Sequence, residues 1–173
     1  MIYKTDYQSP IGSLTIASDG ENIVGLWMDG QKYFGASVDA KMIDRADLPV
    51  LKLTRDWLDK YFAGKRPNIS DLPLAPNGSE FRKSVWRTLT EIPYGSVVTY
   101  GDIARKLGCK SARAIGGAVG HNPISIIIPC HRVVGTNHSL IGYAGGMDNK
   151  IKLLKTECVD LSAFRIPTSG TAI

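Results

Sequence analysis

The sequence predicts an α/β protein, in which a small β-sheet plus helix N-terminal domain at residues 1–75 precedes a mainly helical C-terminal domain at residues 76–173. Two apolar runs on either side of Asp19-Gly20 predict a β-hairpin near the N-terminus. A segment rich in proline and asparagine, residues 64–78, predicts a loop between the domains. Two short helices joined by a glycine-containing turn predict a helix-turn-helix in the second domain.

The N-terminal elements follow from local pattern. Residues 11–17 alternate small or polar side chains with apolar ones, and residues 23–28 form the returning strand. Residues 30–46 are polar, and we expect irregular structure there. Apolar residues then recur at helical spacing from 50 to 62, and Gly64 suits the end of that helix.

Helix starts and stops organise the second domain. Three hydroxyl side chains stand where helix N-caps are expected, at Ser79, Thr99 and Ser111. The corresponding helices are expected to end before Pro93, at Gly108 and at Gly120.

The last of these helices has an unusual composition for a reader of the DNA major groove. Arg113 is its one long cation among small residues: Ala112, Ala114, Gly116, Gly117, Ala118 and Gly120. Small residues let a backbone approach a duplex closely, which suits recognition of DNA shape. Close packing of this helix against another helix explains the glycines equally well.

Composition restricts the class of protein. Hydrophobic residues make up 43% and charged residues 21%, so the chain can bury a core. No apolar run approaches the roughly 20 residues of a membrane helix, and residues 1–6 do not resemble a signal peptide. The three cysteines form no CxxC pair, which argues against a disulfide framework or a zinc ribbon. We therefore expect a cytoplasmic protein with no membrane partner.

The positive charge lies in the second half of the chain. Residues 1–78 carry nine Lys/Arg and ten Asp/Glu, whereas residues 79–157 carry eleven and five. A basic half beside a neutral half favours a polyanion such as nucleic acid as partner. The alternative is a solvated basic surface without a partner.

Cys130 is the candidate reactive residue. A buried cysteine is usually an inert hydrophobe, but Cys130 is preceded by Pro129 and followed by the cations His131 and Arg132, which favour a thiolate. The glycine-rich segment 142–146 would let backbone approach a flat ligand.

A Cys–His hydrolase is one interpretation of this pattern. On extended backbone adjacent side chains point to opposite faces, so His131 would reach Cys130 only through a water or a bent backbone. Otherwise His121 or His138 would have to be the base, and no residue that would orient either one is evident.

The motif around Cys130 resembles the active site of the O6-alkylguanine-DNA alkyltransferases, the methylated-DNA–protein-cysteine methyltransferase family. Further segments follow in the family's order and spacing: residues 92–100, 113–118, 122–123, 129–133, 142–146, 150 and 153–157. The resemblance is detailed over 79–157 and only general over 1–75. It implies a ribonuclease H-like N-terminal domain and a winged helix-turn-helix-like C-terminal domain.

The resemblance also implies catalytic roles. Cys130 would accept the alkyl group, His131 would act as its base through a water, and Glu157 would orient the histidine. Tyr100 would donate a proton to the leaving guanine, although from the residues alone a buried structural tyrosine is the simpler interpretation. Lys150 is expected near the pocket or at a helix start and is not assigned a catalytic role.

Binding roles follow from the same resemblance. Asn122 would hold the connection between the recognition helix and the active-site loop. Tyr143, Ala144 and Gly145 would wall the guanine pocket, with Val134 beside them. Ala144 stands where the family often has serine, so it offers a backbone N–H but no hydroxyl.

DNA binding is assigned to the second helix of the pair. Arg113 would fill the base stack when the damaged nucleotide is flipped out. Its expected neighbours at the DNA are Ser111, Ala112, Gly116 and Gly117.

The function expected from the resemblance is direct DNA repair by a monomer. The O6-alkyl group of guanine in duplex DNA would pass irreversibly to Cys130, with O4-methylthymine as a second substrate, and each molecule would act once. Some relatives hold zinc in the N-terminal domain through cysteine and histidine, and none is expected here because residues 1–78 contain neither. The resemblance implies that the transfer itself needs no cofactor or metal. The alternatives are a lesion sensor without transfer, disfavoured by Cys130, a helix-turn-helix regulator and a thiol hydrolase.

Overall fold

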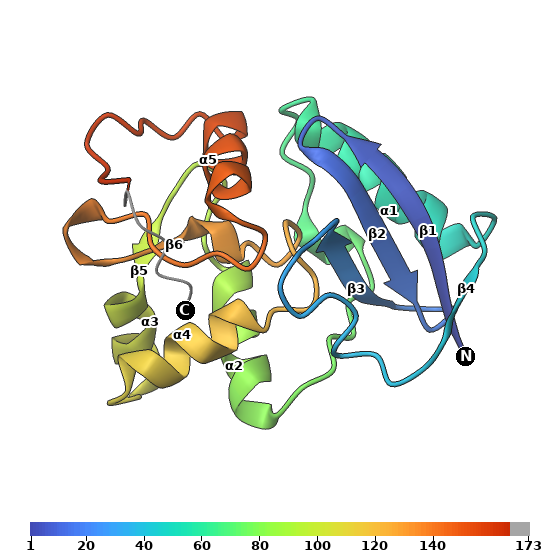
Figure 1. Ribbon diagram of the computed structural model, residues 1–173, viewed down its shortest axis with the longest axis horizontal. Coiled ribbons are helices and arrows are strands. Elements are labelled where there is room, and N and C mark those ends of the chain that lie inside the picture. The colour runs from blue at the N-terminus through green and yellow to red at the C-terminus, as the bar shows by residue number, and fades with distance from the viewer. Residues whose placement is uncertain (167–173) are drawn as a thin grey trace. The chain divides into compact units, whose positions relative to one another are not determined.

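A four-stranded sheet forms the first unit of the computed structural model, which describes residues 1–166 (Figure 1). The strands are β1 (Ile2–Ser9), β2 (Gly12–Ser18), β3 (Ile23–Met28) and β4 (Met42–Asp44), in the order β3-β2-β1-β4. The first three pair antiparallel, and β4 runs parallel to β1. The predicted hairpin is therefore confirmed as β2–β3, whereas β1 and β4 were not predicted.

Helix α1 (Pro49–Phe62) lies across one face of this sheet (Figure 1). Pro49 occupies its first turn, where the missing N–H costs nothing. Its buried face includes Trp57 and Leu58, and Gly64 follows its end with a φ of +76°. The predicted helix and its glycine stop are confirmed. A single turn of 3₁₀-helix, η1 (Ile69–Asp71), follows.

The first unit takes in a distant piece of chain. It comprises residues 1–78 together with 123–127, and the second unit comprises 79–122 and the residues from 128 onward. Leu26 pairs in parallel with Ile124, and its N–H donates to the carbonyl of Pro123 at 2.9 Å. The sequence predicted a single boundary near residue 76, and it did not predict that residues 123–127 join the first unit. Of the predicted C-terminal domain, residues 167–173 lie outside the described residues.

Four helices and a short parallel sheet make up the described part of the second unit. The helices are α2 (Glu80–Thr90), α3 (Tyr100–Leu107), α4 (Ala112–Gly120) and α5 (Met147–Thr156). The strands are β5 (Val98–Thr99) and β6 (Val133–Val134), and the 3₁₀ turns are η2 (Cys130–Arg132) and η3 (Thr136–His138).

The predicted N-caps are confirmed. The hydroxyls of Ser79, Thr99 and Ser111 each accept a backbone N–H three residues on, and Thr99 forms a reciprocal capping box with Asp102. Gly108 ends α3 with a φ of +62°. The predicted end of α4 at Gly120 is confirmed, with His121 as the C-cap that follows it.

Helix α4 has two distinct faces. Ile115, Gly116, Ala118 and Val119 are buried, and the indole N–H of Trp86 in α2 donates to the Ala118 carbonyl at 2.8 Å. The close-packing interpretation therefore accounts for Gly116. Ser111, Ala112 and Arg113 are exposed, and Gly117 is half-buried.

Candidate active site

Cys130 begins the η2 turn, immediately after Pro129. Its N–H donates to the carbonyl of Ile128 at 2.8 Å, so the chain bends sharply at the proline. The expectation of extended backbone here is wrong, since residues 130–132 form a turn of 3₁₀-helix. This bend turns His131 and Arg132 towards Glu157, which is the residue that follows α5.

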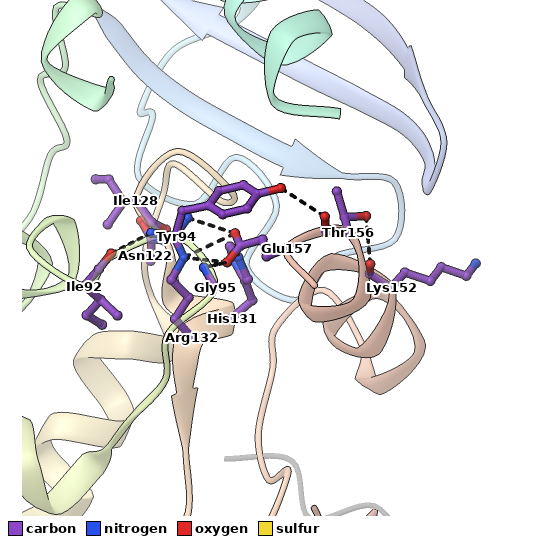
Figure 2. Close-up of polar contacts among 10 residues, drawn as sticks. All are labelled: Ile92, Tyr94, Gly95, Asn122, Ile128, His131, Arg132, Lys152, Thr156 and Glu157. Carbon is purple, nitrogen blue, oxygen red and sulfur yellow. Dashed lines mark hydrogen bonds and ion pairs between the residues drawn. The ribbon is translucent and has the colours of Figure 1, made fainter. Parts of the chain in front are cut away.

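Glu157 is the centre of a buried polar network (Figure 2). Its Oε1 lies 2.7 Å from His131 Nε2, and Arg132 donates to both carboxylate oxygens. The backbone N–H of Gly95 donates to Oε2 at 3.1 Å. Arg132 also donates to the carbonyl of Ile92 at 2.6 Å. All three guanidinium nitrogens of Arg132 therefore donate hydrogen bonds in this network.

The pKa shifts in this network fix its charges. Burial alone would raise the pKa of Glu157, but the bonds from His131 and Arg132 hold it far below its usual range. Burial lowers the pKa of His131, and the Glu157 carboxylate only partly opposes this. At neutral pH the structure therefore holds an ionised Glu157 and a neutral His131.

A neutral His131 has one N–H, and Glu157 determines where it lies. Because the carboxylate can only accept, Nε2 carries the hydrogen and Nδ1 is left with a free lone pair. Nδ1 is buried and has no hydrogen-bond partner among residues 1–166. The imidazole is thus oriented as a proton acceptor, which is what a general base requires.

A small cavity lies beside Cys130. Its volume of about 10 Å³ is close to the minimum that holds one water molecule. It is lined by Tyr100, Gly116, Val119, Gly120, Cys130, Gly142, Tyr143 and Ala144. Tyr100, Tyr143 and Ala144, which were expected at the pocket or in the reaction, therefore line the same cavity as Cys130. Within the described chain, Gly145 and Val134 are not part of this lining.

Opposing effects act on the Cys130 thiol. Burial raises its pKa, whereas hydrogen bonds from Asn122 and Tyr143 and the charge of Lys150 act to lower it. The Asn122 amide also donates to the Ile128 carbonyl at 2.8 Å, just before the bend (Figure 2). The expectation that Arg132 activates this thiol is wrong, because Glu157 neutralises Arg132 and the facing cation is Lys150.

Lys150 is fully buried in the first turns of α5, and its position was not predicted in detail. Its ammonium donates to the carbonyls of Val133, Ile141 and Gly142, at 2.6, 3.2 and 3.1 Å. Burial lowers its pKa to about 8, and Cys130 opposes this shift. Lys150 therefore ties the strand after Cys130 to the loop that walls the cavity.

Tyr100, the first residue of α3, presents its phenol to the same loop. Its hydroxyl donates to the carbonyl of Ile141 at 3.2 Å, with Gly142 O at 3.4 Å. Burial and the charge of Cys130 both raise the pKa of Tyr100. The phenol consequently stays protonated at neutral pH and can donate a hydrogen bond at the cavity.

Comparison with known proteins identifies the family. Residues 80–159 match the family model described as 6-O-methylguanine DNA methyltransferase, DNA binding domain, and residues 2–76 match its ribonuclease-like domain. The chain belongs to the 6-O-methylguanine DNA methyltransferase family. The resemblance inferred from the motifs around Cys130 is confirmed.

Relatives in this methyltransferase family span nearly the whole chain. The methylated-DNA–protein-cysteine methyltransferase of Haemophilus influenzae is 42% identical over 157 residues, covering 90% of this chain and 86% of its own. That of Methanosarcina acetivorans is 44% identical over 162 residues, covering 90% and 98%.

Solved structures of the family confirm the predicted fold class. The Mycobacterium tuberculosis O6-methylguanine methyltransferase matches with a TM-score of 0.79 at 40% identity, over 91% of this chain and 93% of its own. The M. tuberculosis protein solved in complex with DNA matches with a TM-score of 0.81 at 39% identity, over 90% and 93%.

Proposed function

We propose that this protein repairs duplex DNA directly, by moving the O6-alkyl group of guanine irreversibly to Cys130. The observation that carries the proposal is the position of Cys130. It lines a small cavity, and the next residue, His131, is oriented by a hydrogen bond to Glu157. Membership of a family whose curated members are named methylated-DNA–protein-cysteine methyltransferases supports the substrate. Among residues 1–166 no helix has the length and apolar character to cross a membrane.

The transfer needs a thiolate, because a neutral thiol is a poor nucleophile. The Cys130 proton passes through one water to His131 Nδ1, which is buried and has no hydrogen-bond partner among residues 1–166. The resulting imidazolium is stabilised by Glu157, as in other cysteine–histidine–carboxylate sites. Lys150 stabilises the negative charge on sulfur.

The transfer forms one bond and breaks one bond. The sulfur of Cys130 attacks the alkyl carbon, a C–S bond forms, and the bond from carbon to guanine O6 breaks. The electron pair moves onto the guanine ring, Tyr100 supplies a proton to the departing base, and the proton held by His131 then returns to the Tyr100 phenolate through solvent. Because the product is a thioether, each molecule reacts once.

Access to the base requires DNA binding through α4. Its exposed first turn carries Ser111, Ala112 and Arg113, and Arg113 is a long cation suited to fill the stack after base flipping. Gly117 is half-buried beside them, whereas buried Gly116 supports packing and the cavity lining.

We predict that Arg113→Ala slows transfer from duplex DNA at least tenfold, because an empty stack raises the cost of flipping by more than about 1.4 kcal/mol. Arg82→Ala, in the first turn of α2, is the control for loss of one cation, and it should weaken binding only through charge. The measurement is the single-turnover rate on a duplex containing one O6-methylguanine. Equal rates for both variants would contradict the role of Arg113.

Intact mass spectrometry with peptide mapping tests the proposed function. After incubation with a duplex containing one O6-methylguanine, we expect the Cys130 peptide to gain one CH₂ group, saturating at one equivalent. Lesion binding without a mass gain would indicate a sensor. If the protein shows no mass gain and no lesion binding, the remaining alternatives are a regulator and a hydrolase. The same assay with O4-methylthymine decides whether that base is a second substrate.

A further inference from the structure

Gln31 is buried just beyond the end of β3, and its side chain folds back onto the strand. A tight turn with Gly30 at a φ of +72° brings the Gln31 N–H to the carbonyl of Met28 at 3.0 Å. The Oε1 atom of Gln31 then accepts the Met28 N–H at 3.0 Å. The same oxygen accepts the hydroxyl of Ser125, also at 3.0 Å.

Ser125 lies in the segment 123–127, which completes the first unit. Its own N–H donates to the carbonyl of Leu26 at 2.9 Å, so both its backbone and its side chain are fixed. Gln31 is 7% exposed and Ser125 is 2% exposed. A hydrogen bond between such buried groups is costly to break, because each partner is left without water.

The residue after Ser125 is held in an unfavourable backbone conformation. Ile126 has a φ of +71°, and the Ile127 N–H donates to the Ser125 carbonyl at 2.8 Å, which closes a three-residue turn. A positive φ in a β-branched residue is a genuine outlier, and this form of γ-turn is strained. Such strain, of order 1–3 kcal/mol, persists only where the surroundings enforce it.

The strained turn leads directly to the reacting cysteine. Three residues separate Ile126 from Cys130, and a second tight turn closes between Ile128 and Cys130. The intervening isoleucines are at most 2% exposed. The path from the strained turn to the sulfur is therefore short, buried and bounded by two hydrogen-bonded turns. Displacement of a reacting group by about 1 Å can cost roughly 100-fold in rate.

We propose that Gln31 is a positioning residue for alkyl transfer, which acts by holding Ser125 and with it the strained turn that sets the place of Cys130. The proposal rests on the proposed function of Cys130. Gln31 lies 99 residues before Cys130 and is not among the described residues that line the cavity beside it. It gives the N-terminal unit a direct part in the reaction rate.

The test compares three variants with a matched control. Gln31→Met removes the acceptor at similar length, Ser125→Ala removes the donor, and Ser125→Thr keeps a hydroxyl. The control is Thr54→Val, which removes a fully buried hydroxyl of α1 that donates to the Val50 carbonyl at 2.8 Å, within the same unit. Thermal unfolding midpoints show whether the variants are comparably destabilised.

The readout is single-turnover methyl transfer over a range of duplex concentrations. We expect Gln31→Met and Ser125→Ala to lower the rate constant at saturating DNA about tenfold, without changing the half-saturating concentration. Ser125→Thr should restore most of the rate, and Thr54→Val should keep it. The double variant Gln31→Met/Ser125→Ala should be no slower than Gln31→Met alone, because Gln31→Met already removes the bond to Ser125 together with the bond from the Met28 N–H.

Opposite outcomes separate the two proposals. If Gln31→Met and Ser125→Ala transfer the methyl group as fast as the wild-type protein, the positioning role is overturned and the proposed function stands. A loss of rate in Thr54→Val that matches its fall in unfolding midpoint would also overturn the positioning role, since stability would then explain every variant. Absence of transfer in the wild-type protein would overturn the proposed function itself.

Discussion

Replacing Cys130 by serine is expected to abolish methyl transfer completely while leaving lesion binding within about twofold of wild type. A serine hydroxyl is a far weaker nucleophile than a thiolate, and His131 cannot ionise it enough for attack on an alkyl carbon. The change replaces one small buried atom by another, so the fold should be retained. Intact mass measures transfer, and fluorescence anisotropy with lesion-containing duplex measures binding.

The other two cysteines provide matched controls. Cys109 is half-buried, Cys158 is exposed, and neither lines the cavity beside Cys130. Cys109→Ser and Cys158→Ser should therefore accept one methyl group at the wild-type rate. A mass gain that persists in Cys130→Ser, or one that maps to another peptide, would contradict Cys130 as the acceptor.

Glu157→Gln is expected to have the largest effect on stability, lowering the free energy of unfolding by about 3–5 kcal/mol. The buried Arg132 guanidinium would lose its counter-charge, which the amide cannot replace. The amide can also donate to His131, which would leave the tautomer undefined and slow transfer. Urea denaturation measures the first effect, and single-turnover transfer measures the second.

The pH dependence of this variant follows from the pKa shifts. The pKa of Glu157 lies far below its unfolded value of about 4.3, so its contribution is complete above that pH and is lost as pH falls. The pKa of His131 is also lowered, so stability begins to fall below its unfolded value of about 6.5. Glu157→Gln should flatten the loss below about pH 4.3.

An exposed glutamate is the control for this effect. Glu80, in the first turn of α2, pairs with Lys83 on the surface at 3.6 Å. Glu80→Gln should change the free energy of unfolding by less than about 1 kcal/mol. If Glu157→Gln were as stable as Glu80→Gln across the acid range, the buried network would not have the charges assigned to it.

Local features of the fold were predictable because their causes are local. The caps at Ser79, Thr99 and Ser111 depend on bonds that span three residues. Strand β4 was missed because three residues of a polar segment become a strand only by pairing with β1. Strand β1 carries polar side chains that give no strong apolar alternation.

The site also combines features that the sequence could predict with features that depend on contacts between distant segments. The segment around Cys130 and Glu157 could be found because its residues follow one another in a recognisable order. The engagement of Arg132 by Glu157 and the burial of Lys150 could not, because both depend on where α5 meets the η2 turn. The Gln31–Ser125 bond joins residues 94 apart, and neither residue type suggests it.

The return of residues 123–127 to the first unit also affects how the chain is made. A ribosome that has finished residue 78 must add 49 more before the edge of β3 receives its last segment. At about 5–20 residues per second this takes roughly 2–10 s, during which the edge at Leu26, unlike that at Ile23, which pairs with Leu74, stays open to unwanted pairing. The nascent first unit therefore receives its last segment only after α4 has been synthesised, so its completion depends on the second half of the chain.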